Sequence, residues 1–256
     1  MTSNSRAFRN IPYANSPAPP NRFKPPVAKQ GWTGVLDATS FGPGCFSAYP
    51  GANSPEPMSE DCLSLNVFTP RNYSGQAAGK QLPVMVWFYG GSFSTGSGPG
   101  PLNMYDGSFM AGAEEVVVVT FNYRLSALGF LVTNEIAGNM GILDQRMVLQ
   151  WVQRNIAAFN GDPARVTLFG ESAGAWSIAI HLTSPASYAY YNKAILFSHP
   201  IGVRMQQKKG GAIYGREFCR LQVGNKRRMS RLYITSAKDI TFIKLCLSYF
   251  VSSIYI

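Results

Sequence analysis

The sequence predicts an α/β fold with a mostly parallel central sheet and flanking helices. Short runs rich in Val, Ile and Phe, bounded by turn residues, are typical of strands buried on both faces of such a sheet. Helical segments separate the last three of these runs, which is the pattern of an α/β protein. The chain has 256 residues, of which 46% are hydrophobic and 14% charged, so it can bury a sizeable core. The predicted strands cover residues 63–70, 82–90, 114–123, 165–170 and 193–198.

The segment before these strands is crowded with turn-forming residues. Residues 11–60 are rich in Pro, Gly, Ser and Asn, which predicts irregular surface structure with a short strand at 34–38. The N-terminus begins without the apolar run of a secretion signal. Residues 240–256 are too short and too interrupted by Lys244 to cross a membrane, so we predict no transmembrane helix.

Three helices are predicted in the second half of the strand region. In residues 143–159 apolar side chains recur at helical spacing, and the Asn-Gly-Asp-Pro segment at 160–163 ends the helix. A second helix is expected over residues 173–182, directly after a strand, and a third over residues 184–192.

Positive charge is concentrated at the C-terminal end. The net charge is +10, and nine of these charges fall within residues 204–256, so the preceding part of the chain is nearly neutral. Nucleic-acid binding would therefore rest on the tail alone, and we expect no nucleic-acid partner.

The segment Gly170-Glu171-Ser172-Ala173-Gly174 lies between a predicted strand and a predicted helix. Strand, G-x-S-x-G and helix together form the nucleophile elbow of α/β-hydrolases, in which a strained turn exposes the serine hydroxyl. Side chains at Gly170 or Gly174 would collide where strand and helix pass closely. The alternative is a tight turn without chemistry.

A second motif, Trp87-Phe88-Tyr89-Gly90-Gly91-Ser92-Phe93, ends another predicted strand in small residues. Such residues let backbone amides approach the carbonyl oxygen of a substrate. With the Ala173 amide they would form an oxyanion hole. The alternative is a Gly-rich loop without function.

Five stretches together resemble the type-B carboxylesterases, the group of α/β-hydrolases that includes cholinesterases, liver-type carboxylesterases and fungal lipases. The resemblance spans about residues 7–220. The stretches are RFKPP with WTGVLDAT, EDCLSLNVF, VWFYGGSF, FNYRLSALGF and GILDQRMVLQWVQRNIAAFNGDPARVTLFGESAGA.

This resemblance implies an α/β-hydrolase fold truncated at both ends, with residues 1–223 as the N-terminal part of a domain about twice as long. Residues 224–256 match nothing in the family and are interpreted as translated non-coding or frame-shifted sequence. A localisation signal or phosphate-binding patch at Lys226, Arg227 and Arg228 is the alternative. A sheet that ends near Ser198 would expose an apolar edge, which predicts poor solubility.

The resemblance also implies site roles. Ser172 corresponds to the nucleophile and the amides of Gly91, Ser92 and Ala173 to the oxyanion donors, with Gly90, Gly170, Glu171 and Gly174 completing the two motifs. Tyr89 stands where many members have histidine, and Ser92 where many have glycine or alanine. Both changes keep the backbone donors, so they bear on substrate range.

Further residues have structural counterparts in the family. The resemblance implies a disulfide between Cys45 and Cys62, which otherwise would be two buried thiols, and two buried ion pairs formed by Arg22 with Glu60 and Arg124 with Asp144. A disulfide favours a secreted protein, although no signal peptide is visible.

The chain contains two histidines, and neither is expected to complete a triad. In this fold the order is serine, acid, histidine, and the resemblance implies that the acid and the histidine lie beyond residue 256. His181 lies nine residues along the helix from Ser172, ~13 Å by helical rise, so a local packing role is expected. His199 follows a strand that ends near Ser172, and it is a substitute base or a loop histidine.

We therefore expect a serine carboxylic-ester hydrolase that acts through an acyl-enzyme on Ser172, weakly active or inactive in this form. Its substrate would be a small-molecule or lipid ester. No cofactor and no metal are expected. The alternative is a non-catalytic, cholinesterase-like binding or adhesion protein, or a truncated gene product.

Overall fold

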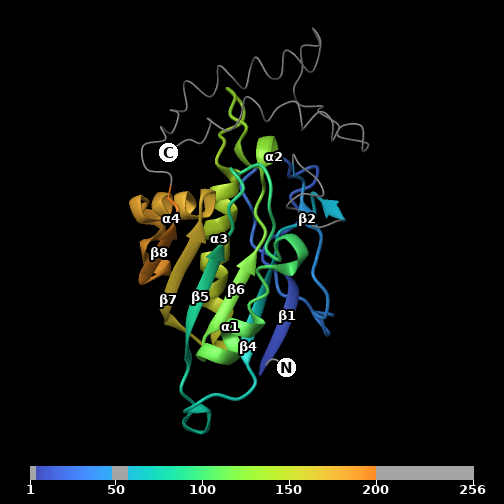
Figure 1. Ribbon diagram of the computed structural model, residues 1–256. Helices are drawn as coiled ribbons and strands as arrows, with labels where there is room; N and C mark the ends of the chain where they lie inside the picture. Colours follow the sequence, from blue (N-terminus) through green and yellow to red (C-terminus); the bar gives the residue numbers. More distant parts are fainter. Residues whose placement is uncertain (1–3, 48–56, 200–256) are drawn as a thin grey trace.

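The computed structural model describes residues 4–47 and 57–199, which form a six-stranded sheet with helices on both faces (Figure 1). Four strands run parallel: β6 (Val117–Phe121), β5 (Leu82–Phe88), β7 (Gly161–Glu171) and β8 (Lys193–Phe197). Strand β4 (Ser64–Pro70) pairs antiparallel with β6, and β1 (Ser5–Pro12) pairs antiparallel with β4. A separate two-stranded sheet pairs β2 (Gly44–Cys45) with β3 (Met58–Ser59). In spatial order the strands of the large sheet are β1, β4, β6, β5, β7 and β8.

The strand β5 lies between β6 and β7, and its side chains alternate between the two faces of the sheet. Val84 pairs with Val117 of β6 and with Val166 of β7, and all three are fully buried. Strands β4 and β6 are buried along their whole length. These β-branched runs suit a sheet covered on both faces.

Helices α3 (Met140–Asn155) and α4 (Ala173–Thr183) cover one face of the sheet, and the short helix α1 (Ser108–Glu114) covers the other (Figure 1). Val148, Val152 and Ile178 join the core on the α3 and α4 side. On the α1 side, Ala111 packs with Phe68 and Val118. The remaining helical pieces are α2 (Ser126–Phe130) and the 3-10 turns η1 (Gln76–Ala78), η2 (Pro101–Asn103), η3 (Ile156–Phe159) and η4 (Pro185–Tyr190).

All five predicted strands and the first two predicted helices are present, whereas other predictions at the element level were wrong or incomplete. Residues 34–38 form no strand, since Val35 is fully exposed and no described strand pairs with it. Strand β1 was not predicted, nor were α1 and α2. The third predicted helix is the 3-10 turn η4. The predicted tail, residues 224–256, lies outside the described residues.

Strand β8 lies at the edge of the described sheet and is less buried than its neighbours. Ile195 and Phe197 are 41% and 49% exposed, so the expectation of strands buried on both faces fails here. Within residues 4–47 and 57–199, no helix has the length and apolar character needed to cross a membrane.

Candidate active site

Ser172 lies on the turn between β7 and α4, at the carboxyl edge of the parallel strands (Figure 1). Its backbone adopts φ 54° and ψ −119°, a strained conformation for a residue with a side chain. The turn is held on both sides. The Ser172 N–H donates to the Phe197 carbonyl at 3.0 Å, and the Ser172 carbonyl accepts from the Trp176 N–H at 2.9 Å. The side chain is half-buried.

The two glycines that flank this turn have no room for a side chain. A Cβ on Gly170 would lie 2.7 Å from the Phe88 carbonyl oxygen, and a Cβ on Gly174 would overlap the same oxygen. The sequence predicted such a collision between strand and helix. The structure shows that much of the obstruction comes from the end of the neighbouring strand β5. The absence of side chains at these two glycines therefore allows the serine turn to lie close to the loop that follows β5.

That loop carries the predicted oxyanion donors. A Cβ on Gly90 would lie 3.1 Å from the Cβ of Ser172 and 2.8 Å from Glu171 Oε2, so the loop contacts the nucleophile turn directly. Gly91 has φ 105°, and its carbonyl accepts from the Ser94 and Thr95 N–H groups at 2.9 and 3.1 Å. Ser92 is exposed and has φ 53°. Residues about 80 positions apart are thus brought together.

Tyr89, the first residue after β5, anchors this loop in the protein interior. Its ring stacks on Tyr123 with a centroid separation of 4.5 Å, and both rings are buried. Each hydroxyl donates to the other residue's carbonyl, Tyr123 to Tyr89 at 3.1 Å and Tyr89 to Tyr123 at 3.3 Å. Burial and the neighbouring Tyr123 raise the pKa of Tyr89 well above its ordinary value, so the ring stays neutral. Tyr89 therefore holds the loop from the interior of the protein.

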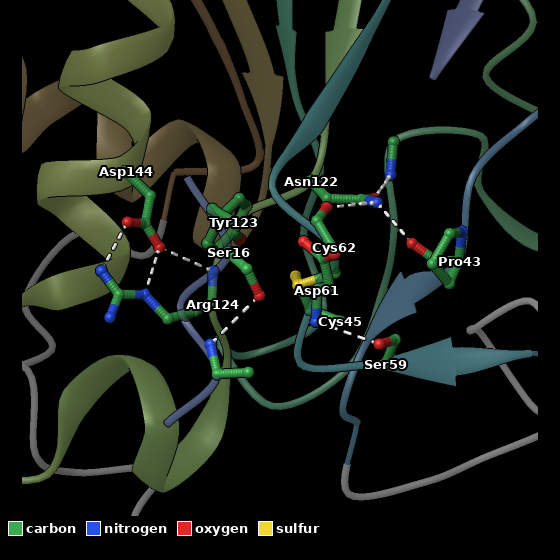
Figure 2. Close-up of a disulfide and its surroundings, with 12 residues drawn as sticks. Ser16, Pro43, Cys45, Ser59, Asp61, Cys62, Asn122, Tyr123, Arg124 and Asp144 are labelled. Carbon is green, nitrogen blue, oxygen red and sulfur yellow. Dashed lines mark hydrogen bonds and ion pairs between the residues drawn. A yellow bond between two sulfur atoms is a disulfide. The ribbon is translucent and has the colours of Figure 1, made fainter. Parts of the chain in front are cut away.

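A disulfide joins Cys45 in β2 to Cys62, just before β4 (Figure 2). The neighbouring Asn122 binds both segments, since its Nδ2 donates to the carbonyls of Pro43 and Cys62 at 3.0 and 3.1 Å. Its Oδ1 accepts from the Gly98 N–H at 2.8 Å. The sequence analysis missed Asn122, because a lone asparagine after a strand carries no signal of such contacts.

Both ion pairs implied by the resemblance are present. Arg22 Nε donates to Glu60 at 2.8 Å, and both side chains are largely buried. Arg124 and Asp144 are more deeply buried and form two hydrogen bonds, of 2.8 and 2.7 Å (Figure 2). The Arg124 N–H adds a third bond to the same carboxylate at 3.1 Å. These contacts fix the segment that follows β6.

Neither histidine forms a hydrogen bond with Ser172. His181 is fully buried, and its ring nitrogens lie 3.0 Å from Ser187 Oγ and 3.2 Å from Gln145 Oε1, so it has the expected local role. His199 is half-buried, and its Nε2 lacks a hydrogen-bond partner. It lies two residues after Phe197, whose carbonyl binds the Ser172 N–H. Among residues 4–47 and 57–199 no cluster of three His, Cys, Asp or Glu side chains could hold a metal.

The chain is similar in sequence and in fold to known esterases. Acetylcholinesterase of Electrophorus electricus is 48% identical over 208 residues, which cover 75% of this chain and 31% of that protein. The solved structure of a PNB esterase superimposes with a TM-score of 0.82 at 39% identity and covers 98% of this chain and 51% of its own. A thermophylic PNB esterase gives 0.81 at 39% identity, covering 95% and 50%.

The chain therefore spans about half the length of the solved esterases that it matches and about a third of the acetylcholinesterase. The family model described as Carboxylesterase family matches residues 1–236. With a serine on a strained strand-to-helix turn, a glycine loop against it and this match over most of its length, the chain belongs to the carboxylesterase family.

Proposed function

We propose that the protein represented by this chain hydrolyses carboxylic esters of small molecules or lipids through an acyl-enzyme on Ser172. The observation that carries the proposal is the contact between the Ser172 turn and the loop Gly90 to Ser92, at 3.1 Å between Ser172 Cβ and a Cβ position on Gly90. Residues 1–223 would form the N-terminal part of the catalytic domain. The Cys45–Cys62 disulfide supports secretion into an oxidising compartment.

In the acylation step Ser172 Oγ attacks the ester carbonyl carbon while a base takes its proton. The carbonyl oxygen becomes an oxyanion, which accepts hydrogen bonds from the amides of Gly91, Ser92 and Ala173. The alcohol then leaves with the proton from the base. Water attacks the acyl-enzyme in the same way and releases the acid, so Ser172 regains its proton.

The base is proposed to be a histidine, held by an acid, from the part of the family domain that the chain does not span. His181 is unsuited to this role because both ring nitrogens have partners and burial lowers its pKa to about 3. His199 has a buried Nε2 without a partner but forms no hydrogen bond with Ser172. It is the second candidate for the base.

A serine-reactive phosphonate probe tests the proposal on native protein. After extracts of cells that produce this protein are treated with the probe, we expect the peptide containing Gly170 to Gly174 to carry the adduct on Ser172. We expect the labelled species to have about twice the 28.0 kDa of this chain. An expressed Ser172→Ala variant should lose the label, whereas Ser74→Ala, which removes an exposed hydroxyl elsewhere, should keep it.

Failure to label Ser172 in folded native protein, in an extract where other serine hydrolases react, would rule the proposal out. A labelled species near 28 kDa would instead assign the base to this chain. A His199→Gln variant that loses labelling would then identify His199 as that base.

A further inference from the structure

A buried row of polar side chains lies between α3 and α4, beneath the nucleophile turn. Ser177 and His181 project from α4 four residues apart, on one face of the helix. Gln145 of α3 and Ser187 of η4 face them, and all four residues are completely buried. Buried polar groups are costly unless they are hydrogen-bonded, so the arrangement of their bonds carries information.

The hydrogen bonds form one continuous chain. Ser177 Oγ donates to the Ala173 carbonyl at 2.9 Å, and Gln145 Nε2 donates to Ser177 Oγ at 2.9 Å. His181 Nε2 lies 3.2 Å from Gln145 Oε1, and its Nδ1 lies 3.0 Å from Ser187 Oγ. At the far end Arg146 Nε donates to Ser187 Oγ at 3.1 Å.

We call this series of hydrogen bonds from Ala173 to Arg146 the relay. Its two ends, the Ala173 carbonyl and the Arg146 guanidinium, fix the position of every proton between them. A carbonyl only accepts, so the single Ser177 proton points to Ala173 and Ser177 must accept from the amide nitrogen of Gln145. The amide oxygen of Gln145 then faces His181, so Nε2 carries the imidazole proton. An arginine only donates, so Ser187 accepts from Arg146 and gives its proton to His181 Nδ1. Both ends require the same tautomer.

We propose that His181, in its neutral Nε2–H form, is a positioning residue that orients Ala173 through Gln145 and Ser177. The relay ends on the residue whose N–H is the third oxyanion donor, so the inference rests on the proposed function. The ring also packs against Phe88 at 5.8 Å between centroids. The Phe88 carbonyl lies against the glycines of the nucleophile turn, so His181 contacts the end of β5 directly and reaches the turn through Gln145 and Ser177.

The environment of the ring agrees with this role. Burial, and to a smaller extent the Arg146 guanidinium, lower the pKa of His181 to about 3. Arg146 is the charged group that faces the ring, and it is anchored by a second bond to Ser184 Oγ at 2.9 Å. A neutral imidazole is what the relay requires, because a protonated Nδ1 would oppose the Ser187 proton.

Nitrogen-15 NMR of the 256-residue chain tests the relay without any enzymatic reaction. The chain has only two histidines, so His199→Gln assigns the signals of His181. We expect the Nε2–H tautomer, with no titration of His181 between pH 8 and pH 4. In Gln145→Glu, Ser177 must divide its single proton between a carboxylate and Ala173. The carbonyl carbon signal of Ala173 should move upfield, and the pKa of His181 should rise toward that of an ion-paired histidine.

Gln150→Glu is the matched control, since Gln150 lies on the same helix and donates to the Tyr190 hydroxyl at 3.2 Å, outside the relay. It should leave His181 and Ala173 unchanged. In native-length protein that hydrolyses esters, Gln145→Glu should lower kcat about tenfold, which corresponds to one hydrogen bond, with KM within about twofold. Gln150→Glu should leave both constants unchanged.

A His181 signal of the Nδ1–H tautomer, titration near pH 6.5, or an unmoved Ala173 carbonyl signal in Gln145→Glu would overturn the relay. An equal kcat in the two glutamate variants would overturn the positioning role while leaving the relay in place. Absence of any Ser172-dependent hydrolysis would be a failure of the proposed function, and the NMR result would stand apart from it.

Discussion

The two ion pairs Arg124–Asp144 and Arg165–Asp162 show how burial decides what a charged residue contributes. Asp144 is fully buried and accepts three hydrogen bonds from Arg124. The second pair joins neighbouring positions on the surface, where the Arg165 side chain is 43% exposed. Removing one partner of a buried pair leaves an uncompensated charge in a poorly polarisable interior, whereas a surface charge is rehydrated.

Asp144→Asn should therefore lower the free energy of unfolding by about 3–5 kcal/mol. Asp162→Asn, the matched surface change, should lower it by less than about 1 kcal/mol. Urea denaturation of the two variants and the parent chain measures both values. Equal losses would contradict the assignment of Arg124 and Asp144 as a structural pair.

At the level of elements, the turn between β7 and α4 depends on the close approach of this helix to the sheet. Gly174 is the second residue of α4 and faces the Phe88 carbonyl at the end of β5. Any side chain at this position would therefore push the helix away from the sheet. Gly31 lies in a surface segment where a Cβ would meet nothing within 4 Å.

Gly174→Ala should destabilise the chain by about 3 kcal/mol, the cost of overpacking at a site that cannot relax, and Gly31→Ala should change stability by less than about 0.5 kcal/mol. Thermal unfolding followed by circular dichroism compares them. A Gly174→Ala variant as stable as the parent would show that α4 can move away from β5 without loss.

Elements with a strong local pattern could be predicted from the sequence, and those defined by their neighbours could not. The buried runs of β5, β6 and β7 contain β-branched residues throughout, and α3 has a helical repeat of apolar residues. Strand β1 reads as polar because it is an edge strand in which only Ser5 and Ile11 are buried. Helices α1 and α2 have seven and five residues, too few to show a repeat.

For the whole molecule, the Cys45–Cys62 disulfide anchors the irregular N-terminal segment to the sheet. It closes a loop of 17 residues, part of which lies outside the described residues. A cross-link of this length restricts the unfolded chain and contributes about 3 kcal/mol. Cys45→Ser with Cys62→Ser should lower the free energy of unfolding by that amount. A double variant as stable as the parent chain in urea denaturation would contradict a structural role for the bridge.

The candidate site could be predicted only in part. Ser172 and the glycines around it form a continuous motif, so the turn was visible in the sequence. The meeting of this turn with the loop after β5 was expected from the oxyanion hole that accompanies a nucleophile elbow. The relay through His181 could not be predicted, because Gln145, Ser177 and Ser187 acquire partners only when α3, α4 and η4 pack.

The central place of β5 also has a consequence for biosynthesis. Strands β1, β4, β5 and β6 have all been synthesised once Phe121 is added and can pair with one another, whereas β7 and β8 follow later in chain order. A ribosome adds about 5–20 residues per second, so Gly90 is made about 4–16 s before Ser172. During this interval β7 is not yet available to pair with β5, so that edge of β5 is open to a chaperone or to another nascent chain.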